Sequence, residues 1–148
     1  MNRGRKEQGA ILVETAFVLP VLTLVLLMVI DLGLTVREHQ LLQNAAREGA
    51  HFSSLKQNWV NPLNNPNATI ARIQQVVVDY CAKENITINA GDVSVDQNFS
   101  IPLGGGQVVR GSLVSVTYSH QMLLIGRPFL PSSFMTLTAR AVFRNLYN

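Results

Sequence analysis

The fold is decided by residues 9–30, which read GAILVETAFVLPVLTLVLLMVI. Between Ala10 and Ile30 the only formally charged side chain is that of Glu14. The length matches the roughly 20 apolar residues that a helix needs to cross a bilayer. Pro20 removes one backbone donor inside this run, so the pattern also predicts a kink or a local loosening of the helix there.

A secretory signal peptide and a buried core helix are the two alternative interpretations of the apolar run. A secretory signal peptide should end in a small-x-small cleavage site, but the sequence after Ile30 continues DLGLTV without a convincing one. A buried core helix would need a second layer of helices, which the rest of the chain does not supply. The pattern therefore favours a retained transmembrane helix over residues 10–30.

A short basic leader precedes the apolar run. Arg3, Arg5 and Lys6, set against Glu7, give residues 1–9 a charge of +2. The charges between residues 31 and 48 sum to −1. By the positive-inside bias, the N-terminus should stay in the cytoplasm and residues 31–148 should be exported.

Glu14 requires a partner if it lies deep in lipid, because a central carboxylate costs about 2.5–3.5 kcal/mol on insertion scales. Near a helix end it could instead reach back to the headgroup layer. If the chain is cut after Gly9, the new amino group of Ala10 lies one helical turn from Glu14. Amine and carboxylate of neighbouring subunits could then pair inside the apolar layer.

Several segments together point to a known family. They are Gly9-Ala10 with Val13-Glu14, Val18-Leu19-Pro20, LQNAAREGA at 42–50, VSVTY at 114–118 and LTARAV at 137–142. These segments resemble the type IV pilin and pseudopilin superfamily, and within it the TadE-like minor pseudopilins of the tight-adherence (Flp) pilus. Many pilins begin the mature chain with Phe, whereas this chain has Ala10.

The resemblance implies a location and a set of partners. A prepilin peptidase would recognise the leader residues Arg3, Arg5 and Lys6 and cleave after Gly9. The helix would remain in the bacterial inner membrane, with its head in the periplasm or in the extracellular pilus. The partners would be the lipid bilayer, the inner-membrane pilus assembly platform and other pilins, including the major Flp pilin and a second minor pseudopilin.

The exported part shows alternating helix and strand patterns. The helical spacing continues from Asp31 to about Phe52 and returns over 68–84, and half-buried strands are expected over 93–101, 108–118 and 135–143. The small residues Ala45, Ala46, Gly49 and Ala50 suggest close approach of the first helix to a sheet. The predicted class is α+β and pilin-like, with a transmembrane and stalk helix, a second helix and a small antiparallel sheet.

No catalytic constellation stands out, so we expect a structural protein that is not an enzyme and needs no cofactor. Cys81 is the single cysteine, and with His39, His51 and His120 at unrelated spacings it predicts no metal site. Its helical surroundings indicate a small core residue. Gly104-Gly105-Gly106 lacks the lysine of a phosphate loop and predicts a turn. No basic cluster outside the leader indicates a nucleic-acid partner.

The connection over residues 122–131 is unusually apolar for a loop. It either folds over the core or forms an interface through Leu124, Ile125, Phe129 and Leu130. The sequence as a whole predicts a minor pseudopilin that takes part in pilus assembly. The alternatives are an unprocessed single-pass membrane protein with a periplasmic binding module, and an exported enzyme with an N-terminal anchor.

Overall fold

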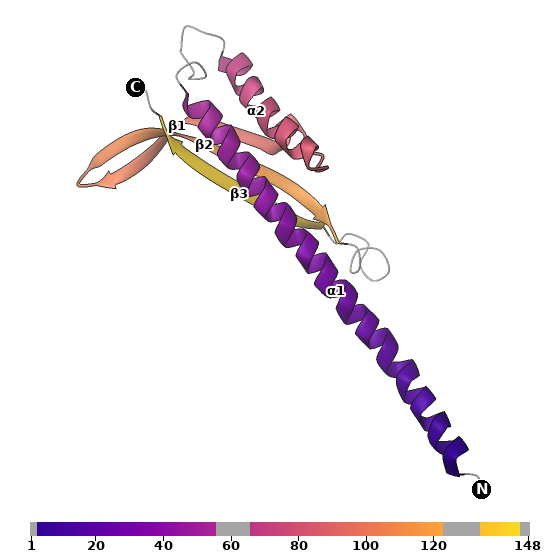
Figure 1. Ribbon diagram of the computed structural model, residues 1–148. Helices are drawn as coiled ribbons and strands as arrows, with labels where there is room; N and C mark the ends of the chain where they lie inside the picture. Colours follow the sequence, from indigo (N-terminus) through magenta and orange to yellow (C-terminus); the bar gives the residue numbers. More distant parts are fainter. Residues whose placement is uncertain (1–2, 56–65, 123–133, 146–148) are drawn as a thin grey trace.

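The computed structural model describes residues 3–55, 66–122 and 134–145. Figure 1 shows one long helix, α1, whose C-terminal half carries a small head and whose N-terminal half projects away from it. The predicted α+β class is confirmed, with a long apolar N-terminal helix, a second helix and a three-stranded antiparallel sheet.

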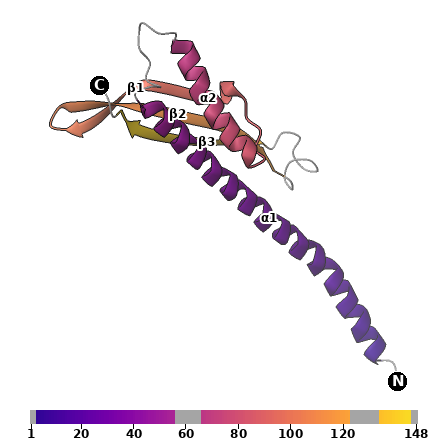
Figure 2. The same cartoon turned by 45° about the horizontal axis from the view of Figure 1, so that its top comes forward.

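Helix α1 spans Arg3–Ser54 and contains 52 residues. It is longer than expected, because residues of the leader continue the helix without a break. At 1.5 Å per residue it measures about 78 Å, more than twice the thickness of a bilayer's hydrocarbon core. The helix passes through Pro20 without interruption, and Figure 2 shows that its axis curves gently. A kink located at Pro20 stays a prediction.

The head is a single sheet with helices on one face. The strands are β1 (Val93–Gly104), β2 (Gln107–Gln121) and β3 (Phe134–Arg144), in the order β1-β2-β3 and antiparallel throughout. α1 lies against β2 and β3, and the second helix, α2 (Pro66–Lys83), lies beside α1 and reaches β1. The opposite face exposes Ser94, Asp96, Thr117 and Thr138. It also carries Leu113 and Val142, which lie in register with Asp96.

The glycine triplet forms the predicted turn between β1 and β2. Gly104, Gly105 and Gly106 have φ values of 84°, 61° and 80°, a region that disfavours residues with a Cβ. The strands on either side of the turn, β1 ending at Gly104 and β2 beginning at Gln107, extend closer to it than the predicted bounds of 101 and 108. The resulting hairpin projects beyond the end of α1 (Figures 1 and 2).

One buried polar residue of β1, Gln97, was not among the inward-facing residues predicted for this strand. Gln97 follows Val95 on the face toward the helices and is buried, while the register with β2 shifts between Asp96 and Phe99. An extra residue at such a bulge reaims the side chains of the strand. Gln97 thus faces the end of α1, where its amide bonds to Ser53.

Gln97 belongs to a closed polar network at the membrane-distal end of α1. Its Nε2 donates to Ser53 Oγ at 2.8 Å, and Ser53 Oγ donates to Ser112 Oγ at 3.0 Å. Ser112 Oγ donates to Asn145 Oδ1 at 3.0 Å, and Asn145 Nδ2 donates to the Gln97 carbonyl at 3.2 Å. All four side chains are buried. The network ties α1, β1, β2 and the segment after β3 together.

The core forms where the small residues of α1 meet the sheet, as the sequence predicted. Leu42, Ala45, Ala46 and Ala50 are fully buried. Their neighbours in the core cluster come from α2 and the strands and include Ile73, Val77, Cys81, Val114, Val116, Leu137 and Ala139. Small side chains let the helix approach closely, and a Cβ added to Gly49 would overlap Val77 Cγ2.

Replacing Gly49 by Ala tests this close approach. The added methyl would meet Val77 Cγ2 and lie 3.4 Å from Val114 Cγ1, so Gly49→Ala should lower the free energy of unfolding of the head by about 1–3 kcal/mol. Gly33→Ala is the matched control in the same helix, because a Cβ there meets no atom within 4 Å. Denaturant unfolding in detergent micelles measures both, and equal effects would contradict the packing described.

Cys81 is fully buried, which confirms its assignment to the core. Burial raises the pKa of its thiol from 9.0 to about 11. Since the thiol of the unfolded chain loses its proton at lower pH than that of the folded chain, the free energy of unfolding of the head should fall as pH rises from 9.0 toward about 11.

Alkylation of Cys81 by iodoacetamide at neutral pH should be slow in the folded protein and fast in denaturant. Rapid alkylation of the folded protein would refute the assignment.

Candidate functional site

The apolar half of α1 has no protein partner among the described residues. Every side chain from Ile11 to Ile30 is exposed, and the segment forms the one described helix that is long and apolar enough to cross a membrane. Burying a single Val, Leu, Ile or Phe side chain contributes about 1.5–3 kcal/mol. Twenty residues of such surface are therefore compatible with lipid or neighbouring helices and not with water.

The hydroxyl groups in this segment are satisfied within the helix. Thr15 Oγ1 donates to the Ile11 carbonyl and Thr23 Oγ1 to the Leu19 carbonyl, both at 2.9 Å. Such i−4 bonds let Thr lie in an apolar layer without an external partner. Glu14 is exposed on the same segment, which leaves it as the one charged group there.

Gly9 precedes the apolar segment and lies inside α1, where it is exposed. A Cβ at this position would meet nothing within 4 Å. Glycine inside a helix costs about 1 kcal/mol relative to alanine, and here neither packing nor a positive φ requires it.

The other predicted site residues fall into two groups. Arg3, Arg5, Lys6 and Ala10 belong to the first turns of α1, and Ala10 lies four residues before Glu14, one turn away. Residues 124–130, with the proposed interface residues Leu124, Ile125, Phe129 and Leu130, lie outside the described residues.

The junction between the apolar segment and the head contains a charged cluster that sequence reasoning missed. Asp31 directly follows the apolar run and is buried, as is His120 of β2. His120 Nδ1 lies 2.6 Å from Glu38 Oε2, and His120 Nε2 lies 3.6 Å from Asp31 Oδ1. We call Asp31, Glu38 and His120 the junction cluster.

The imidazole of His120 lies between the two carboxylates of the junction cluster, with Nδ1 facing Glu38 and Nε2 facing Asp31. Among the described residues Nε2 has no hydrogen-bond partner, since 3.6 Å is an ion-pair distance. Burial and the charge of Glu38 raise the pKa of the nearby Tyr118.

The sequence held a partial signal for the junction cluster. Asp31 and Glu38 are seven residues apart and share a helix face, and His120 continues the inward-facing series of Val114, Val116 and Tyr118 in β2. Their contact depends on the direction in which α1 crosses β2. Neither the helical spacing of α1 nor the alternation of β2 predicts that direction. Among the described residues, no group of three or more His, Cys, Asp or Glu side chains could hold a metal ion.

Comparison with known proteins agrees with the resemblance drawn from the N-terminal segments. Residues 9–51 match the family model of TadE-like proteins, which confirms that resemblance over this part of the chain. The matched region runs along α1 from Gly9 to His51. Searches of curated proteins and of solved structures gave no match.

Removing the imidazole tests the energetic role of the junction cluster. His120→Ala should remove the buried ring that lies 2.6 Å from Glu38 and 3.6 Å from Asp31 and lower the free energy of unfolding by about 1–3 kcal/mol. The control is Arg37→Ala. Arg37 lies on α1 close to Glu38 and forms an exposed pair at 4.0 Å with Glu84, which follows α2, and this pair should contribute at most about 1 kcal/mol. Chemical unfolding in micelles measures both. Equal effects would show that the cluster does not hold the head on α1.

Proposed function

We propose that the chain is a minor pseudopilin of a Tad pilus, anchored by α1 in the bacterial inner membrane, with its head in the periplasm. The observation that carries the proposal is the placement of Glu14. It is exposed on a segment of α1 that carries no other charge between Ala10 and Ile30, and it lies one turn after Ala10. The match of residues 9–51 to TadE-like proteins supports the same conclusion.

Processing after Gly9 is the first step of the proposed function. Gly9 costs helix stability and fills no packing role, which supports a role in recognition by a prepilin peptidase. The basic residues Arg3, Arg5 and Lys6 would hold the leader on the cytoplasmic side. Because glycine weakens the helix locally, this turn can open to a peptidase at lower cost than its neighbours.

Assembly is the second step. Cleavage gives Ala10 a positively charged amino group at the start of the apolar segment. Glu14 of a neighbouring subunit would pair with that amine and offset the cost of about 2.5–3.5 kcal/mol for a carboxylate in lipid. The pairing fixes the axial register of adjacent helices, because a helix shifted by one turn leaves both charges unpaired.

The head supports a minor role over that of a major subunit. The short major Flp pilins consist of little more than a helix, whereas this chain carries a sheet and a second helix beyond α1. It would join the major pilin and a second minor pseudopilin on the inner-membrane assembly platform. An unprocessed membrane-anchored binding module differs in one measurable property, an intact N-terminal Met1.

Replacing Glu14 separates processing from assembly. In a strain that assembles this pilus, mass spectrometry should find the wild-type protein and Glu14→Ala both beginning at Ala10, because the peptidase acts on the leader. Glu14→Ala should give no pili, since the amine of the neighbour then lacks its partner. Thr23→Val is the control, because that hydroxyl bonds only within its own helix and pili should form normally.

Two outcomes would contradict this account. Recovery of wild-type protein with Met1 intact would exclude processing and favour the unprocessed binding module. Normal pili in the Glu14→Ala strain would exclude the charge pairing as the basis of assembly, even if the leader is removed.

A further inference from the structure

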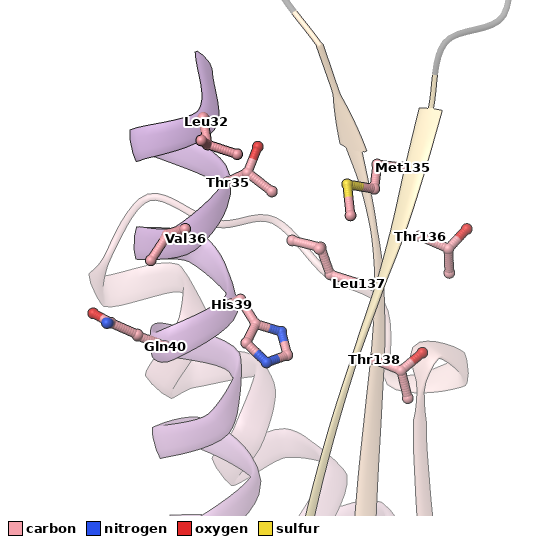
Figure 3. Close-up of a pocket in the computed structure, with 9 residues that line it drawn as sticks. All are labelled: Leu32, Thr35, Val36, His39, Gln40, Met135, Thr136, Leu137 and Thr138. Atoms are coloured by element: carbon pink, nitrogen blue, oxygen red, sulfur yellow. The ribbon is translucent and has the colours of Figure 1, made fainter. Parts of the chain in front are cut away.

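An apolar groove lies between α1 and the beginning of β3, next to the membrane segment. Its volume is about 520 Å³, within the range of roughly 300–1,000 Å³ typical of small-molecule sites. Figure 3 shows Met135 and Leu137 pointing from β3 toward α1, with His39 reaching from α1 toward the strand. The lining residues are Leu32, Thr35, Val36, His39, Gln40, Met135, Thr136, Leu137 and Thr138.

The groove continues the apolar surface of the membrane segment. Leu32 follows the run that ends at Ile30, and its side chain is 65% exposed. Val36, one turn further, is 50% exposed, and Met135 across the groove is 44% exposed. The exposed apolar surface of α1 therefore passes into the groove without interruption.

The charged residues at this level of α1 are turned away from the groove. Asp31 and Glu38 face His120 in the junction cluster, and Arg37 pairs with Glu84. No Asp, Glu, Lys or Arg is among the described residues that line the groove. This arrangement lets the groove face approach a bilayer without desolvating a charge.

The position of the groove along α1 corresponds to the outer edge of the bilayer. Residues 11–30 cover about 30 Å of helix, the thickness of the hydrocarbon core. Leu32 lies about 3 Å beyond Ile30 and Val36 about 9 Å, whereas the interfacial layer is roughly 5–8 Å deep. The groove therefore begins within this layer at Leu32 and reaches past it at His39 and Gln40, so a lipid bound along the groove would be raised partly out of the bilayer.

We propose that this groove binds one diacyl phospholipid of the periplasmic leaflet, with an acyl chain against Leu32, Val36 and Met135 and the headgroup near His39. The inference rests on the membrane anchoring in the proposed function, but on neither processing nor pilus assembly. The lipid would cover the exposed apolar surface at the junction and hold the head close to the membrane.

Fluorescence quenching tests the contact with lipid. Single tryptophans are placed in the full chain after Trp59→Phe, which removes the one native tryptophan. The protein is reconstituted in vesicles of phosphatidylethanolamine and phosphatidylglycerol with bromine atoms near the glycerol end of the chains. Val36→Trp and Met135→Trp should lose emission, as should Leu22→Trp in the membrane segment. Val108→Trp on the distal hairpin should keep it.

Native mass spectrometry from micelles tests specific binding. The wild-type protein should retain one phospholipid, Val36→Glu should lose it, and Val108→Glu should retain it. Val108 is a suitable control because its side chain is 60% exposed, comparable to Val36. Circular dichroism should show the same helix content in both variants.

The proposal requires both results. Emission unaffected at Val36 and Met135, with Leu22→Trp quenched, would overturn the lipid groove and leave the membrane anchor intact. Emission unaffected at Leu22 as well would remove the anchor and with it the proposed function. A dimer that Val36→Glu dissociates, in place of a lost phospholipid, would assign the groove to a second copy and overturn the proposal.

Discussion

The structure depends on one helix that must satisfy two different surroundings. Residues 11–30 of α1 present apolar side chains in every direction, as a lipid environment requires. Beyond Asp31 the apolar surface narrows to a stripe of small residues, and the sheet packs on that stripe. Because α1 is continuous, the head has no independent orientation. Its position relative to the membrane is set by where the stripe begins.

Polar groups fix the register of the sheet on α1 at both ends of their contact. Near the membrane, Asp31 and Glu38 meet His120; at the far end, Ser53 meets Ser112. His120 and Ser112 are eight residues apart in β2, about 26 Å, and Glu38 and Ser53 are 15 residues apart in α1, about 22 Å. The two spans are similar in length, and the pairing of Glu38 with His120 and of Ser53 with Ser112 makes β2 run antiparallel to α1. Small apolar residues alone would let the sheet slide along α1. A shifted register is nonetheless unfavourable, because it would leave buried polar groups unpaired.

The sequence predicted those features that depend on local periodicity. The two helices, the three strands, the glycine turn and the close approach at Ala45, Ala46 and Gly49 follow from patterns within a few residues. The polar contacts depend on tertiary register: His120 and Glu38 are 82 residues apart, and Gln97 and Ser53 are 44 residues apart. Each of these residues by itself fits an ordinary polar position of a strand or helix. The local spacing of its own element therefore does not predict its partner.

The continuity of α1 through the leader also bears on the proposed processing. Removal of residues 1–9 leaves the packing of residues 31–54 unchanged, because the contacts of that segment lie in the head. It creates a helix N-terminus whose first four N–H groups lack intrahelical acceptors. In lipid no water satisfies them, and the new ammonium group adds to the positive end of the helix dipole. Glu14, one turn inside that end, is the one charged side chain between Ala10 and Ile30. Cleavage would thus convert Glu14 from a costly group in lipid into the required partner of a neighbouring terminus.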